Sequence, residues 1–82
     1  MDVSTINKLL DEINDDKSVP RNIRTSIAEA KHHLNSEADL EIKVNSAVSI
    51  LDEASSDPNV SMYTRTQIWN IVSILETIKD SA

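Results

Sequence analysis

Glycine and cysteine are both absent from the 82-residue chain. Phosphate-binding loops, the dinucleotide fingerprint, the nucleophile elbow and the standard calcium loop all need glycine where a side chain would clash, so none of them can form here. The lack of cysteine excludes disulfides, thiolate zinc sites and cysteine nucleophiles. These two absences remove most of the enzyme and cofactor classes that short motifs identify.

Basic residues, aromatic residues and long apolar runs are scarce. Lys and Arg total 8 against 14 Asp and Glu, which gives a net charge of −6. Phosphate backbones repel an acidic chain, so we expect no direct nucleic-acid contact, and a basic protein surface fits the charge better. No apolar run approaches the roughly 18 residues that span a bilayer, and Met1–Ser4 lacks the features of a signal peptide. We therefore expect a cytoplasmic protein that does not bind membranes.

The two halves of the chain, residues 1–41 and 42–82, align without a gap. Eleven positions are identical, whereas the composition predicts roughly three by chance. The identical pairs are Val3/Val44, Leu10/Leu51, Asp11/Asp52, Glu12/Glu53, Asp16/Asp57, Val19/Val60, Arg24/Arg65, Thr25/Thr66, Ile27/Ile68, Leu34/Leu75 and Asp39/Asp80. A period near 40 residues is typical of a two-helix repeat. We expect a single domain, residues 1–82, made of these two repeats.

Apolar residues recur every three or four positions in four segments, which predicts helices over residues 3–13, 19–34, 38–55 and 60–79. Their apolar faces are Val3, Ile6, Leu9, Leu10 and Ile13; Ile23, Ile27, Ala30 and Leu34; Leu40, Val44, Ala47, Leu51 and Ala54; and Ile68, Ile71, Val72, Leu75 and Ile78. Because all links are short, neighbouring helices should run antiparallel. The prediction is an all-α, up-down-up-down four-helix bundle of two helical hairpins related by a pseudo-two-fold axis.

Polar residues at the segment ends predict where the helices begin. Ser18 is expected to cap the second helix, with Pro20 in its first turn. Ser36, followed three residues later by Asp39, resembles a capping box for the third helix. Pro58 disfavours helix at Asp57 and so marks the second turn.

The sequence carries two family resemblances. Asp16–Arg24 and Asp57–Val60, followed by Arg65 and Trp69, are similar to the small archaeal proteins of uncharacterised protein family 0147. This resemblance covers the whole chain and implies a compact helical protein from an archaeon, with no known activity and no catalytic residue to carry over. The turn around Asp16 and Val19 also resembles a HEAT-type helical repeat, although Arg24 lies several residues too late and the chain has only two units.

Charged residues flank both turns at equivalent positions. Arg24 and Arg65 follow the turns, while Asp11 and Glu12, or Asp52 and Glu53, precede them. In an antiparallel hairpin these groups come level, so we predict structural carboxylate–arginine clamps across each turn. The alternative is a pair of charged surfaces that a partner recognises.

Trp69 departs from the repeat, because its counterpart is Ala28. It lies roughly 120° from the centre of the apolar face on a helical wheel. Met62 lies on the same side, with Arg65 between them. Tryptophan with methionine and arginine is typical of an interaction hot spot. The alternative is that Trp69 covers a gap between the fourth helix and a neighbour.

Metal binding is possible at two places but poorly supported at both. Adjacent His32 and His33 point about 100° apart on a helix and cannot chelate one ion as residues four apart would. Acidic residues gather before the first turn, with no calcium-loop spacing; they are Asp11, Glu12, Asp15 and Asp16. We therefore expect no metal or cofactor.

The leading hypothesis is a non-enzymatic interaction module that recognises a protein partner through Trp69, Met62 and Arg65. The partner could also be a second copy of the chain, since Ile42 is expected to face away from the core. The alternative is a small enzyme or a divalent-metal protein that uses the acidic cluster.

Overall fold

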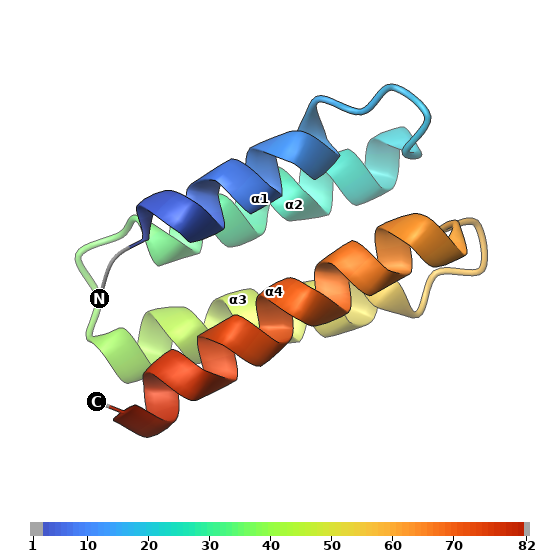
Figure 1. The fold of residues 1–82 in the computed structure, drawn as a ribbon. Helices are drawn as coiled ribbons and strands as arrows, with labels where there is room; N and C mark the ends of the chain where they lie inside the picture. Colours follow the sequence, from blue (N-terminus) through green and yellow to red (C-terminus); the bar gives the residue numbers. More distant parts are fainter. Residues whose placement is uncertain (1–2, 82) are drawn as a thin grey trace.

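The computed structural model describes residues 3–81 and contains four α-helices (Figure 1). They are α1 (Ser4–Asn14), α2 (Arg21–Leu34), α3 (Leu40–Ser55) and α4 (Met62–Ser81). The described residues contain no strand, so the expected all-α class with four helices is confirmed. The expected domain ends, residues 1 and 82, lie outside the described part of the chain.

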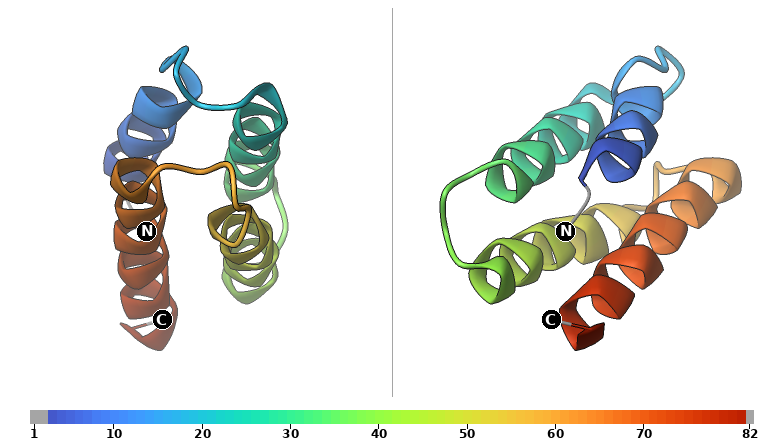
Figure 2. Two further views of the ribbon diagram at one scale, coloured as in Figure 1. Left: turned by 90° about the vertical axis from the view of Figure 1, so that its right-hand side faces the viewer. Right: turned by 60° about the vertical axis from the view of Figure 1, so that its left-hand side comes forward.

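Each helix packs on two others. α1 contacts α2, α2 contacts α3, α3 contacts α4, and α4 returns to α1. Viewed end-on, the helices occupy four corners, with α1 beside α4 and α2 beside α3 (Figure 2). The α1–α2 and α3–α4 turns lie at one end of the molecule, and the α2–α3 link lies at the other (Figure 1). The result is one core inside a molecule of 34 × 19 × 19 Å.

The core consists of the apolar stripes of all four helices. Its buried members are Ile6, Leu10, Ile13, Val19, Ile23, Ile27, Ala30, Leu34, Val44, Ala47, Leu51, Ala54, Val60, Ile68, Ile71 and Leu75. Two of them, Val19 and Val60, come from the turns and not from helices. Val72 and Ile78, which were expected to face inward, are only partly buried at its margin. Ile50 and Ile74 flank the core, and Ile42, which was expected to face away from it, is 57% exposed.

The first turn differs from the prediction, because α2 begins at Arg21 and Ser18 does not cap it. The carboxylate of Asp16 accepts hydrogen bonds from the Ser18 main-chain N–H (2.9 Å) and hydroxyl (2.6 Å). This side-chain turn uses the hydroxyl that a cap would need. Pro20 therefore stands just before the helix, where its carbonyl accepts from the N–H groups of Ile23 and Arg24.

The capping box predicted for the third helix is also wrong. α3 begins at Leu40, and Asp39 makes no side-chain cap hydrogen bond. The Ser36 hydroxyl instead donates to the carbonyl oxygen of His33 at 2.7 Å, which ties it to the end of α2. α4 begins at Met62, later than expected, and the hydroxyl of Ser61 accepts the N–H of Thr64 at 3.2 Å.

Both turns repeat one hydrogen-bond pattern. Asp57 Oδ1 accepts the N–H of Asn59 at 2.8 Å, as Asp16 accepts that of Ser18. In each turn the valine N–H donates to the aspartate carbonyl three residues before it, at 3.1 Å. Each aspartate therefore closes its turn and directs the following valine into the core. Within residues 3–81, none of the helices has the length and apolar character needed to cross a membrane.

Candidate interaction surface

Trp69, Met62 and Arg65 lie on one side of α4, and we call these three residues the Trp69 edge. Trp69 is 50% exposed and Met62 is 64% exposed. The seven-residue spacing between them places both side chains along the same line of the helix. The core residues Ile68 and Leu75 are fully buried on the neighbouring stripe. Trp69 thus has half of its surface exposed to solvent.

Arg65 is held in place by the turn that precedes it. It donates three hydrogen bonds to main-chain oxygens: from Nε to Ser55 (2.8 Å), and from Nη2 to Asp57 (3.1 Å) and Val60 (3.3 Å). The carbonyl of Ser55 ends α3, where helical carbonyls lack partners within the helix and a cation is favourable. Arg65 therefore ties the end of α3 to the start of α4.

These contacts correct the predicted carboxylate–arginine clamps. Arg65 binds main-chain oxygens, and neither Asp52 nor Glu53 pairs with it. Arg24 has its Nε buried without a hydrogen-bond partner among the described residues. The hairpin register explains the difference, because Asp11 lies level with Lys31, seven residues along α2 from Arg24, whereas Arg65 turns toward its own turn. Three of the four predicted carboxylates are exposed to solvent.

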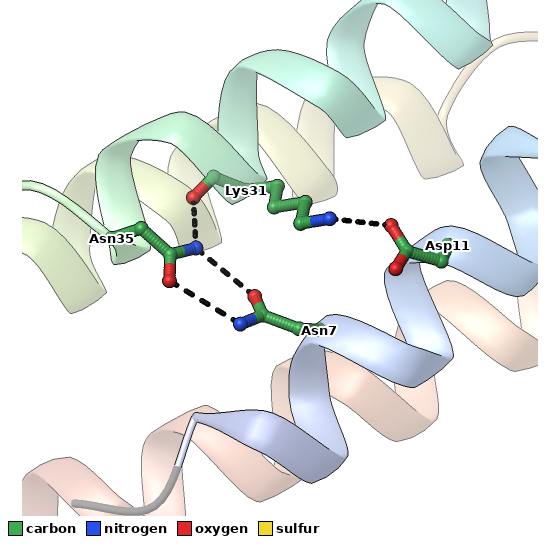
Figure 3. Close-up of polar contacts among 4 residues, drawn as sticks. All are labelled: Asn7, Asp11, Lys31 and Asn35. Carbon is green, nitrogen blue, oxygen red and sulfur yellow. Dashed lines mark hydrogen bonds and ion pairs between the residues drawn. The ribbon is translucent and has the colours of Figure 1, made fainter.

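A different cation pairs with Asp11. Lys31 Nζ lies 2.7 Å from Asp11 Oδ1, and this is the one ion pair within residues 3–81 (Figure 3). One turn along, Asn7 and Asn35 exchange side-chain hydrogen bonds of 3.0 and 3.2 Å. We call these four residues the α1–α2 seam. Two polar pairs close the outer junction of the first hairpin.

An open groove of about 430 Å³ runs beside this seam. Its floor is apolar, with Leu10 and Ile27, and its rim is polar. The other lining residues are Asp11, Asn14, Ala28, Lys31, His32 and Asn35. Ala28 is the counterpart of Trp69, so the small residue of the first hairpin leaves space where the second hairpin carries an indole.

The acidic residues before and within the first turn do not act as one cluster, because they have different partners. Asp11 pairs with Lys31, and Asp16 accepts both hydrogen bonds from Ser18. The hydroxyl and then the main-chain hydrogen bond of Ser18 lower the pKa of Asp16 below 3.8. Glu12 and Asp15 are exposed.

The histidines are a surface pair. His32 is exposed and His33 partly buried, and their rings meet edge to face at 6.1 Å. Among the described residues, no group of three or more His, Asp or Glu side chains could hold a metal ion.

Several features of the structure were not predicted from the sequence. Tyr63 is 70% exposed next to Met62, and Thr64 is buried where the first hairpin has Ile23. The asparagine pair of the α1–α2 seam depends on helix register and had no sequence signal. The Asp11–Lys31 pair could have been predicted, because the two side chains carry opposite charges and share the antiparallel register of the asparagine pair.

Three kinds of comparison relate the chain to known proteins. A family model described as "Uncharacterised protein family (UPF0147)" matches residues 2–78. A UPF0147 protein of Methanosarcina acetivorans is 50% identical over 72 residues, which is 87% of this chain and 74% of the relative. One of Sulfurisphaera tokodaii is 45% identical over 73 residues, 88% of this chain and 82% of the relative.

A solved structure agrees with the fold. It is the crystal structure of MMP1188, a protein of unknown function, with a TM-score of 0.87 and 47% identity. The match covers 92% of this chain and 86% of that one. These similarities give no evidence for the HEAT-type resemblance.

Proposed function

The chain belongs to the uncharacterised protein family UPF0147, and we propose that it is a non-enzymatic interaction module that binds a protein partner through the Trp69 edge. The observation that carries the proposal is the half-exposed indole of Trp69 with exposed Met62 on the same side of α4. Tryptophan, methionine and arginine are enriched at the centres of protein interfaces. A monomer gains little from leaving both apolar side chains in water, whereas a partner could bury them.

The edge is also anchored to the turn before α4, which favours binding. The three hydrogen bonds of Arg65 fix the turn under Met62. A surface that is ordered before binding loses less conformational entropy when a partner docks. Arg65 in this proposal supports the edge and presents its aliphatic part, while its guanidinium stays with the main chain.

We extend the proposal to the architecture. The chain is an up-down-up-down bundle in which two repeats are related by a pseudo-two-fold axis. The equivalent hydrogen bonds of the two turns support it. Burial supports it too, because core residues recur 41 positions apart, for example Leu10 and Leu51 or Ile27 and Ile68. We also propose a cytoplasmic location, since small secreted domains usually depend on disulfides and this chain has no cysteine.

The experiment compares the proteins that co-purify from the source cell with the wild type and with Trp69→Ala. Tyr63→Ala is the matched control, because Tyr63 is also exposed and lies elsewhere around α4. We expect Trp69→Ala to lose specific proteins that Tyr63→Ala retains, with both variants folded by circular dichroism. Recovery of the same proteins by both variants and the wild type contradicts the proposal. Native mass spectrometry of the purified chain shows whether the partner is a second copy.

A further inference from the structure

The two hairpins differ most at their outer seams. In the α1–α2 seam, Asn7 pairs with Asn35, and Asp11 pairs with Lys31 (Figure 3). The residues 41 positions later form what we call the α3–α4 seam: Val48, Glu76, Asp52 and Val72. Each polar pair has become a valine and a carboxylate. The second seam therefore keeps the aspartate, gains a glutamate and lacks the lysine and asparagines that form the polar pairs of the first seam.

Two hydrogen bonds fix the register of this seam. Arg65 Nε reaches the carbonyl of Ser55 at 2.8 Å, and Lys79 Nζ reaches Asn45 Oδ1 at 2.8 Å. On α3, Asp52 follows Asn45 by seven residues and so lies on the same side of the helix. On α4, Val72 precedes Lys79 by seven.

These positions bring Asp52 level with the segment that contains Trp69 and Val72. In the first hairpin, Ala28, the counterpart of Trp69, lines the groove beside the α1–α2 seam, so the repeat places the exposed indole beside the α3–α4 seam. Val48 and Val72 pack against the core at its base.

No cation within the described residues serves the two carboxylates. Asp52 is exposed and Glu76 is partly buried, and neither side chain has a hydrogen bond or ion pair within residues 3–81. Arg65 donates its hydrogen bonds to main-chain oxygens, and Lys79 donates one to Asn45.

Two cations of α2 have no cationic counterpart on α4. Arg21 is replaced by Met62 and Lys31 by Val72. The second hairpin thus presents carboxylates beside apolar side chains.

We propose that the α3–α4 seam binds a segment of a partner protein that carries arginine or lysine next to an apolar residue. The partner's cation pairs with Asp52 as Lys31 pairs with Asp11. It also stacks on the face of Trp69. Charge-assisted hydrogen bonds and cation–π contact make this pairing favourable. The apolar neighbour covers Val72. This inference rests on the proposed function and names the chemistry of its partner.

The negative charge of the protein favours a basic protein segment over nucleic acid and over a second copy of the chain. Nucleic-acid phosphates are repelled by Asp52 and Glu76 and by a net charge of −6. A second copy carries the same net charge, and its own Asp11–Lys31 pair is already formed. A basic protein segment gains electrostatic attraction at long range and supplies the cation that the seam lacks.

The test titrates the isotope-labelled protein with a short blocked peptide of alternating arginine and leucine, followed by NMR and by Trp69 fluorescence. Peptides in which serine or glutamate replaces arginine are the comparison probes. We expect the arginine peptide to shift amide signals around Asp52, Val72 and Trp69. The serine and glutamate peptides should leave those signals in place.

Two double variants test which carboxylates bind the arginine peptide. Asp52→Asn with Glu76→Gln should weaken binding of the arginine peptide by about tenfold or more. The matched control removes the same charge elsewhere, through Glu12→Gln with Glu29→Gln, both exposed on the first hairpin. It should change the affinity by about twofold or less.

A third variant removes no carboxylate. Val72→Lys recreates in the second hairpin the ion pair of the first, so it should also weaken binding, in a protein whose NMR spectrum shows an intact core. Equal loss in the two double variants, or signal shifts spread over both hairpins, overturns the inference as general charge attraction. Equal binding of the serine peptide at the seam also overturns it but leaves the proposed interaction surface standing.

Discussion

Arg65 Nε donates a hydrogen bond of 2.8 Å to the main-chain oxygen of Ser55, and so joins α4 to the last residue of α3. Two further bonds from Nη2 hold the turn between them. Replacing Arg65 with methionine keeps the aliphatic bulk and leaves three partly buried carbonyls without this donor. We expect the free energy of unfolding to fall by about 1–3 kcal/mol in urea denaturation.

The repeat supplies the control for this prediction. Arg24 occupies the equivalent position, but its Nε has no hydrogen-bond partner in the described chain. Arg24→Met should therefore cost less than Arg65→Met. Equal losses in the two variants would mean that the hydrogen bonds to the turn contribute little, and that packing of the side chain dominates at both sites.

The ion pair between Asp11 and Lys31 should contribute only modestly to stability. Its side chains are 46% and 40% exposed, so solvent screens the attraction. A double-mutant cycle with Asp11→Asn and Lys31→Met should give a coupling energy of at most about 1 kcal/mol, which decreases as salt is added. The same cycle with Asp52→Asn and Val72→Met should give no salt-dependent coupling. A coupling there would show that the second seam has its own electrostatic contact.

Asp16 should give the protein a specific sensitivity to acid. Hydrogen bonds from Ser18 lower the pKa of Asp16 below the ordinary 3.8, so the folded state favours the ionised carboxylate. Its contribution to stability is complete above the unfolded pKa, and it is lost as the pH falls through the lower, folded pKa. Thermal unfolding between neutral and strongly acidic pH measures this.

Two variants isolate the effect. Asp16→Asn should remove this part of the acid destabilisation, so that wild type and variant differ most above pH 3.8 and converge below it. Ser18→Ala removes the hydroxyl donor and keeps the N–H, so its pH dependence should be intermediate. Parallel stability curves for wild type and Asp16→Asn would contradict the prediction.

Periodicity predicted the helices and the core, because each helix has one stripe to bury and few alternatives. Ile27 and Ile68 belong to such stripes, and both are fully buried. The helix starts were less predictable, because Ser18 can bond either to its own helix or to Asp16, and only the folded turn decides between them. Arg65 was assigned to carboxylates because side-chain charges are visible in a sequence, whereas a helix end that presents free carbonyls requires three-dimensional register.

The side chain of Trp69 should contribute less to stability than its size suggests. Half of its surface is exposed, while the adjacent Ile68 is fully buried. We expect Trp69→Ala to lower the free energy of unfolding by at most about 2 kcal/mol, against about 2–5 kcal/mol for Ile68→Ala. Urea denaturation of both variants makes the comparison. A Trp69→Ala loss as large as that of Ile68→Ala would assign Trp69 to packing and count against the interaction surface.

Ala28→Trp tests whether the groove of the first hairpin is the space that Trp69 occupies in the second. The groove measures about 430 Å³ and has an apolar floor of Leu10 and Ile27. An indole at position 28 should cover that floor. The free energy of unfolding should therefore stay the same or rise by up to about 1 kcal/mol. In a Trp69→Phe background the new tryptophan is the only one, and its emission should shift to shorter wavelength than that of free tryptophan. Glu29→Trp in the same background is the control, because Glu29 is exposed and does not line the groove. If both variants emit like free tryptophan, the groove does not receive the indole and the two hairpins do not share this feature.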